Sequence, residues 1–165
     1  MEKYQHIDRV RGEFVALMDA ISGLDERAMT VPAVGEWGLR EVLAHIAGWT
    51  RIDTTIMRRL ARGETPLPGD EEYGTGEGRN PGFAKDAAGK PVAAVVNDLH
   101  SAFGEFLAAA ESVPEERFAR GRTAHRVMEE SAFAHIKEHR IEIESYRAKL
   151  RTTVQTVRVP DSELR

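Results

Sequence analysis

Four segments of the chain carry hydrophobic residues spaced three or four apart, which is the period of one face of an α-helix. They run over residues 3–21, 39–62, 92–112 and about 124–150. Amphipathic helices of this length bury their apolar faces against one another. The pattern therefore predicts an all-α fold, and within that class a four-helix bundle.

The connections between these segments differ in length and composition. Residues 22–35 contain Gly23, Pro32 and Gly35 and do not continue the hydrophobic stripe, so they are expected to form a connection. The link from Gly63 to Pro91 holds seven glycines and four prolines, which makes regular structure improbable. Unstructured loops of this length are uncommon inside compact domains and often serve as functional covers or disordered links. We interpret this link as a long crossover or lid between the second and third helices.

The bundle is expected to form a single domain over residues 1–150, followed by a C-terminal tail over residues 151–165. The tail begins with a run of β-branched residues over 152–159, which is typical of a short strand. Pro160 and the polar end of the chain limit such a strand. An arm or a disordered end is the alternative.

Composition and charge exclude several classes of function. The formal net charge is -4 and the pI is near 5.9, so a broad basic surface for nucleic acid is not expected. The chain contains no cysteine, which excludes disulfides, thiolate ligands and cysteine nucleophiles. It shows neither a signal-peptide pattern nor an apolar stretch of the roughly 18 residues that a membrane span requires. We expect no membrane association and a cytoplasmic location.

Two histidines of the fourth segment, His135 and His139, lie four residues apart, so a helix projects both imidazoles from one side. This pair alone fits a metal site and a chance pair at the edge of the core equally well. His45 lies on the apolar face of the second segment and adds a third inward histidine. Burying three imidazoles is costly unless each is hydrogen-bonded or coordinated, and one shared ion satisfies all three. The set favours metal binding over packing.

Three protein nitrogens with an open fourth position are typical of a catalytic metal site, and zinc, nickel or another divalent ion would fit. Glu142 follows His139 by three residues and is a candidate to orient an imidazole, accept a proton or join the ligands. A surface ion pair with Arg140 is the favoured alternative. Glu138 lies about 100° around the helix from His139 and is assigned no role.

The remaining histidines, His6, His100 and His125, do not complete a comparable set and are expected to be surface or capping residues. Of these three, His125 is the one best placed to approach the site.

Trp49 and Trp37 are candidates to line an apolar pocket, although core packing is the commoner use of tryptophan. Asn80 is a candidate to reach a ligand from the long link. The Asn-Pro pair of which it is part is an ordinary turn signal, and that interpretation is favoured.

The segments GEWGLREVLAHIAGW (residues 35–49) and HIKEHRIEI (residues 135–143) resemble the DinB-like superfamily, and within it the DfsB and ClbS group of four-helix proteins. The resemblance covers about residues 3–150 and includes Asn80 in the long link. The chain departs from the common HxxHHRGQ pattern, since Glu138 stands where histidine is frequent and Ile141-Glu142 where Gly-Gln is frequent. This departure leaves the histidines intact and the subgroup open.

The resemblance implies that His45, His135 and His139 form the family's metal triad. It also implies a choice of activities, because characterised members include transferases and isomerases that use small thiols, and the ClbS group includes a protein that resembles a detoxifying hydrolase. The leading hypothesis is a metal-dependent enzyme that acts on a small molecule by hydrolysis or by thiol transfer, with a low-molecular-weight thiol as possible cosubstrate.

Two other hypotheses stay open at this point. A bundle of this kind can instead bind or sequester a small molecule without turnover. A purely structural role would use the histidines for packing and the apolar helix faces for assembly. A homodimer is expected because bundles of this size often pair.

Overall fold

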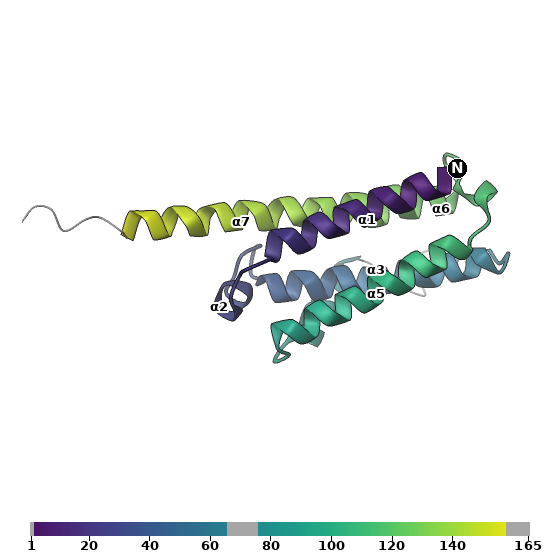
Figure 1. Ribbon diagram of the computed structural model, residues 1–165. Helices are drawn as coiled ribbons and strands as arrows, with labels where there is room; N and C mark the ends of the chain where they lie inside the picture. The colour runs from purple at the N-terminus through teal and green to yellow at the C-terminus, as the bar shows by residue number, and fades with distance from the viewer. Residues whose placement is uncertain (1, 66–75, 158–165) are drawn as a thin grey trace, which may run out of the picture.

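The computed structural model describes residues 2–65 and 76–157, and the side chains of residues 76–81 and 154–157 lie outside the description. Three of the expected helices are α1 (Glu2–Ile21), α3 (Leu39–Ala61) and α5 (Val92–Ser112) (Figure 1). Their bounds agree with the hydrophobic pattern to within one residue. No strand occurs in the described part of the chain. The predicted all-α helical fold is confirmed.

The fourth helical stretch is continuous but not uniform. It begins as α6 (Thr123–Arg126), passes through the π-helix η2 (Val127–Ala134) and continues as α7 (His135–Val157). In a π-helix each N–H bonds to a carbonyl five residues back, a rare geometry that is frequent at functional sites. The strand considered for residues 152–159 is wrong as far as Val157, because the helix continues. Residues 158–165 lie outside the described residues.

Each of the two connections contains a helix, so the expectation that the long link lacks regular structure is wrong. Within the first lies α2 (Glu26–Thr30), whose N-terminus is capped by Asp25: its carboxylate accepts a hydrogen bond of 2.8 Å from the Ala28 N–H. The long link contains α4 (Gly76–Ala87). Burial of Ala84 and Ala87 shows that packing stabilises α4 despite its glycines. The lid role stays a prediction, because residues 66–75 lie outside the description.

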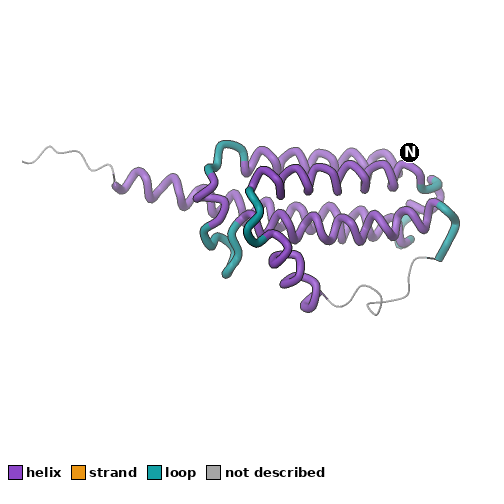
Figure 2. Tube along the Cα trace, turned by 90° about the horizontal axis from the view of Figure 1, so that it is seen from below, coloured by secondary structure: helices purple, strands orange, loops and turns teal. Residues whose placement is uncertain are grey.

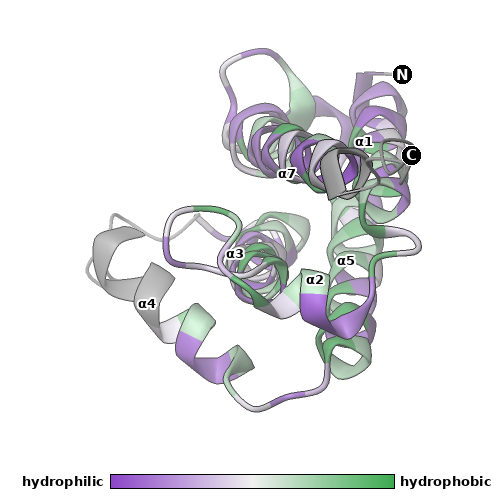
Figure 3. Cartoon of the chain, turned by 90° about the vertical axis from the view of Figure 1, so that its left-hand side faces the viewer, coloured by the Kyte–Doolittle hydropathy of each residue, from purple (hydrophilic) through white to green (hydrophobic). Residues whose placement is uncertain are grey.

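The long helices form two pairs that run in opposite directions. α1 and α7 lie side by side and run the same way, while α3 and α5 form the second pair and run the other way (Figures 1 and 2). The end view shows the four helices around a common centre, with α4 packed outside α3 (Figure 3). The end of α7 projects beyond the other helices (Figures 1 and 2). One face of α3 therefore meets α5 and another meets η2 and α7.

The centre of the bundle is a continuous apolar core. The stripes predicted for α1, α3 and α5 supply most of this core. Leu17, Val42 and Leu99, one from each helix, are fully buried. Phe14 of α1 stacks on Phe103 of α5 with ring centroids 3.8 Å apart, which joins the two pairs of helices. This core holds the helices that carry the functional side chains at fixed positions.

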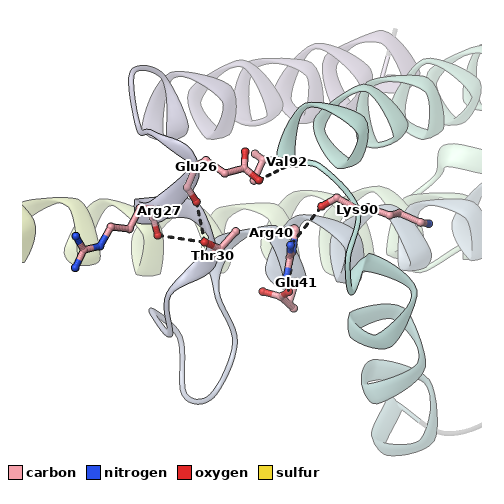
Figure 4. A network of polar contacts seen from close by, with 7 residues as sticks. All are labelled: Glu26, Arg27, Thr30, Arg40, Glu41, Lys90 and Val92. Atoms are coloured by element: carbon pink, nitrogen blue, oxygen red, sulfur yellow. Dashed lines mark hydrogen bonds and ion pairs between the residues drawn. The ribbon is translucent and has the colours of Figure 1, made fainter.

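Polar contacts tie the short α2 and the start of α3 to the start of α5 (Figure 4). The Val92 N–H at the beginning of α5 donates to the Glu26 carboxylate at 3.4 Å, and Arg40 donates to the Lys90 carbonyl at 3.3 Å. From the other pair of helices, the Tyr146 hydroxyl of α7 donates to the Ala28 carbonyl at 3.0 Å. α2 thus links both pairs at one end of the bundle.

Among the described helices, none has the length and apolar content that crossing a bilayer requires.

Candidate metal centre

Three histidines from two helices converge between α3 and α7. His45 lies in the first half of α3, and His135 and His139 lie one turn apart at the start of α7. The Nε2 atom of His135 is 2.8 Å from Nε2 of His45 and 3.1 Å from Nε2 of His139. All three side chains thus point the same kind of nitrogen at one spot, as their spacing predicts.

This geometry fits one divalent ion. Zinc–imidazole bonds of about 2.0–2.1 Å in a tetrahedral site place two ligand nitrogens roughly 3.3 Å apart. The separations of 2.8 and 3.1 Å are slightly shorter, so small side-chain movements would open the space. The ligand atoms of the three residues all lie within 4.8 Å of one another, and no other such group occurs among the described residues.

Burial keeps two of these histidines neutral. Loss of hydration is the main cause that lowers the pKa of His45 to about 4 and that of His135 to about 3, and the nearby imidazole of His139 is the second cause in both. A neutral imidazole has one lone pair free to bind a metal ion. His45 is only 5% exposed, and its Nδ1 atom is buried without a hydrogen-bond partner. The site therefore offers neutral ligands to a cation, and its buried polar atoms destabilise the fold when they have no partner.

Glu142 orients the third histidine. Its carboxylate lies 2.7 Å from Nδ1 of His139, which places the proton on Nδ1 and leaves the Nε2 lone pair facing the other two histidines. The alternative ion pair between Glu142 and Arg140 does not form. Arg140 instead contacts Glu13 of α1 and Glu144 of its own helix.

The triad opens into a pocket of about 510 Å³. Its described walls come from α3, η2 and α7 and comprise His45, Trp49, Glu130, Ser131, Ala134, His135, Glu138 and His139. Trp49, a predicted pocket residue, thus lies beside the histidines. Trp37 is not among these lining residues, and its ring packs against the His45 ring with centroids 5.4 Å apart. Glu138, which was assigned no role, does face the pocket. The side chain of Asn80 lies outside the description, so its predicted contact is untested.

Sequence reasoning missed one polar pair in this region. Asp53 of α3 is 4% exposed, and the Ser131 hydroxyl of η2 lies 2.8 Å from each of its carboxylate oxygens. Burial raises the pKa of Asp53 to about 7, and the hydrogen bond from Ser131 opposes this shift. A signal was present, because His45, Trp49 and Asp53 follow one another at intervals of four along α3. A carboxylate on the face of α3 that points into the bundle needs a buried partner, and this requirement could have drawn attention to Asp53.

The other histidines do not join the triad. His6 contacts the Glu129 carboxylate at 2.6 Å, and its ring meets the ring of His125 edge-on with centroids 5.1 Å apart. Ten residues of helix, most of them in η2, separate His125 from His135, so the two side chains lie more than two turns apart. His125 therefore does not approach the site. His100 is exposed and meets the Phe14 ring edge-on.

α4 closes the outer side of α3 beside the triad. The Phe83 ring lies on Gly48, where an added Cβ would come within 2.4 Å of ring atoms, and it meets the Trp49 ring edge-on at 5.9 Å. A second pocket of about 680 Å³ lies between α3, α4 and α5. α4 thus supports the pocket wall through Trp49 and contributes none of the three histidines.

Comparison with known proteins identifies the family to which the chain belongs. The family model described as the DinB superfamily matches residues 6–141, a range that contains all three histidines. No curated protein and no solved structure matches the chain. The narrower likeness to the DfsB and ClbS group stays a prediction.

Proposed function

The chain belongs to the DinB superfamily, and we propose that it is a metal-dependent enzyme that acts on a small molecule. His45, His135 and His139 would hold one divalent ion, with zinc or nickel as the best candidates. The single observation that carries this proposal is the convergence of three Nε2 atoms at the edge of a pocket. Such an ion acts as a Lewis acid that activates water or a thiol, so hydrolysis and thiol transfer are the two reaction classes we propose.

The residues of this chain would prepare the site in three ways. Burial keeps His45 and His135 neutral, so neither must lose a proton before it binds an ion at pH 7. Glu142 fixes the ring of His139 in the orientation that presents Nε2. Trp49 supplies an apolar wall that would position the substrate and reduce the water around the reacting atoms.

A small thiol cosubstrate and a homodimer are further parts of this proposal. The pocket of about 510 Å³ is large enough for a small substrate together with part of a cosubstrate. Tyr4, Val15 and Ile141 expose apolar side chains on α1 and α7, which supports pairing of two chains through that layer. Sedimentation analysis would measure the oligomeric state directly.

Elemental analysis tests the metal site. The chain would be purified without added metal and without a histidine tag, beside His45→Ala and the double variant His135→Ala, His139→Ala. We expect about one divalent ion per chain in the parent and none in either variant. The double variant His6→Ala, His125→Ala is the matched control, because it removes two partly buried histidines outside the site, and it should keep the ion.

Two outcomes would contradict the proposal. Equal metal content in the parent and the triad variants would place the ion elsewhere. Absence of metal from the parent, even after incubation with zinc or nickel, would favour a bundle that binds or sequesters a small molecule without turnover. If the ion is present, hydrolysis of small esters and amides and transfer of small thiols to electrophiles would be screened next.

A further inference from the structure

Apart from the triad and one alanine, four described residues line the triad pocket: Trp49, Glu130, Ser131 and Glu138. Neither lysine nor arginine occurs among the described lining residues. Glu130 and Glu138 are exposed and accept hydrogen bonds without donating any when ionised. These two side chains therefore favour a ligand that donates hydrogen bonds.

Asp53 makes Ser131 a hydrogen-bond acceptor toward the pocket as well. A serine hydroxyl has one hydrogen, and here both oxygens of the Asp53 carboxylate lie 2.8 Å from Ser131 Oγ. When Asp53 is ionised, the Ser131 hydrogen is committed to it, and only the lone pairs of Oγ remain for the pocket. Because Asp53 is 4% exposed, it cannot itself contact a ligand of any size. Its effect on the pocket passes through Ser131.

A bound ion does not reverse the sign of this charge. A divalent ion held by three neutral histidines contributes two positive charges. Glu130 and Glu138 in the wall, Glu142 behind His139 and Asp53 behind Ser131 supply up to four negative ones. Carboxylates gathered around one pocket act together on the ions that enter it. With these four carboxylates ionised, the named groups keep a net negative charge when the ion is in place.

We propose that the triad pocket takes a small organic cation that donates hydrogen bonds, such as an alkylguanidinium or a protonated amine. Glu130 and Glu138 supply the counter-charge, and Ser131, held by Asp53, accepts one hydrogen bond. Trp49 is part of the same lining, and a tryptophan ring is the aromatic group that cations favour most. This inference deepens the proposed function, since it names the class of substrate for the same pocket.

Calorimetric titration with a matched pair of probes tests the inference. N-butylguanidinium and N-butylurea have nearly the same shape and both donate from nitrogen, but only the first is charged. A guanidinium has no lone pair to give a metal ion and stays protonated, so it reports on the wall alone. The zinc-loaded chain would be used at pH 8.5, above the pKa of about 7 that burial gives Asp53. We expect the guanidinium to bind at least tenfold more tightly than the urea.

Variants locate the source of this preference. In the double variant Glu130→Gln, Glu138→Gln the two probes should bind within about twofold of each other. The control Glu111→Gln, Glu116→Gln changes the net charge equally at exposed positions outside the pocket and should keep the preference. In Ser131→Ala the guanidinium should bind several-fold more weakly. Thermal unfolding of each variant would verify that it is folded.

The possible failures are distinguishable. A zinc-loaded parent that binds urea as tightly as guanidinium overturns this inference and leaves the metal site standing. A preference that survives in Glu130→Gln, Glu138→Gln also overturns it, because the wall would then not be its source. A parent that takes up no ion overturns the proposed function instead, and the same titration on the ion-free chain still decides the preference.

Discussion

Two groups of histidines lie in the bundle, and only one of them forms a candidate site. His6 and His125 come from α1 and α6, whereas the triad comes from α3 and α7. His6 and His125 meet ring against ring, with His6 paired to Glu129, which Arg9 also contacts at 2.7 Å. In the triad, three Nε2 atoms point at one another across 2.8 and 3.1 Å instead. The difference lies in the direction of the ring nitrogens and in what satisfies them.

The two groups also differ in their carboxylate partners. Beside the His6 ring lie a carboxylate and a guanidinium, which satisfy one nitrogen of His6, while Nδ1 of His125 is buried without a partner. The triad has one carboxylate for three rings, and one nitrogen of His45 is likewise buried without a partner. Buried polar atoms without partners are rare and mark places where a ligand, ion or water is expected. Because a buried nitrogen without a partner occurs in both groups, the convergence of three Nε2 atoms is what distinguishes the candidate metal site.

The largest effect that would test this contrast is the response of the ion-free protein to acid. In the unfolded chain histidine takes up a proton near pH 6.5, whereas in the folded chain His45 and His135 do so only near pH 4 and 3. Their contribution to stability is thus complete above about pH 6.5 and is lost as the pH falls. Between pH 7 and 5 this loss is about 2 kcal/mol for each group.

Asp53 acts in the opposite direction over the same range. Its folded pKa of about 7 exceeds the ordinary value of 3.8, so protonation on acidification recovers stability, by about 2 kcal/mol between pH 7 and 5. Asp53→Asn removes this offset and should make the acid loss steeper by that amount. Urea unfolding at several pH values measures both slopes. A double variant without His6 and His125 should keep the parental loss; if the loss disappeared there, the triad would not be its source.

A smaller effect is expected from the carboxylate behind His139. Glu142→Gln weakens the hydrogen bond to Nδ1, and removal of such partners costs about 10- to 100-fold in metal affinity. Glu129→Gln makes the same change beside His6 and should leave the affinity unchanged. Competition with a coloured chelator measures both variants. Equal weakening in the two would show that the loss of charge, and not the contact with His139, is responsible.

The smallest effect concerns the support of the pocket by α4. Gly48→Ala places a Cβ within 2.4 Å of the Phe83 ring, so the ring must move, at a cost of about 1–3 kcal/mol in unfolding free energy. Metal content should stay at one ion per chain, since α4 supplies no histidine of the triad. Gly104→Ala in α5 meets open space and should be neutral or slightly stabilising. Loss of the ion in Gly48→Ala would show that the triad depends on α4.

The periodic parts of the fold were predictable from the sequence to within a residue, as α3 and α5 show. The helices in the connections were not, because α4 owes its burial to contacts with α3 that no local pattern reveals. The π-helical geometry of η2 was not predictable either. Met128 and Ala132 within it fit the stripe of a regular α-helix when the sequence is considered alone.

The sequence by itself determined which histidines share a helix face, because the spacing of His135 and His139 and the apolar neighbours of His45 are properties of single helices. Only the tertiary structure decided that His6 and His125 stay apart from them, that Glu142 contacts His139 and that Asp53 holds Ser131. The physical reason is that helical periodicity sets the direction of a side chain relative to its own axis. The neighbour that it meets depends on how the axes pack, and that packing is settled by the whole core at once.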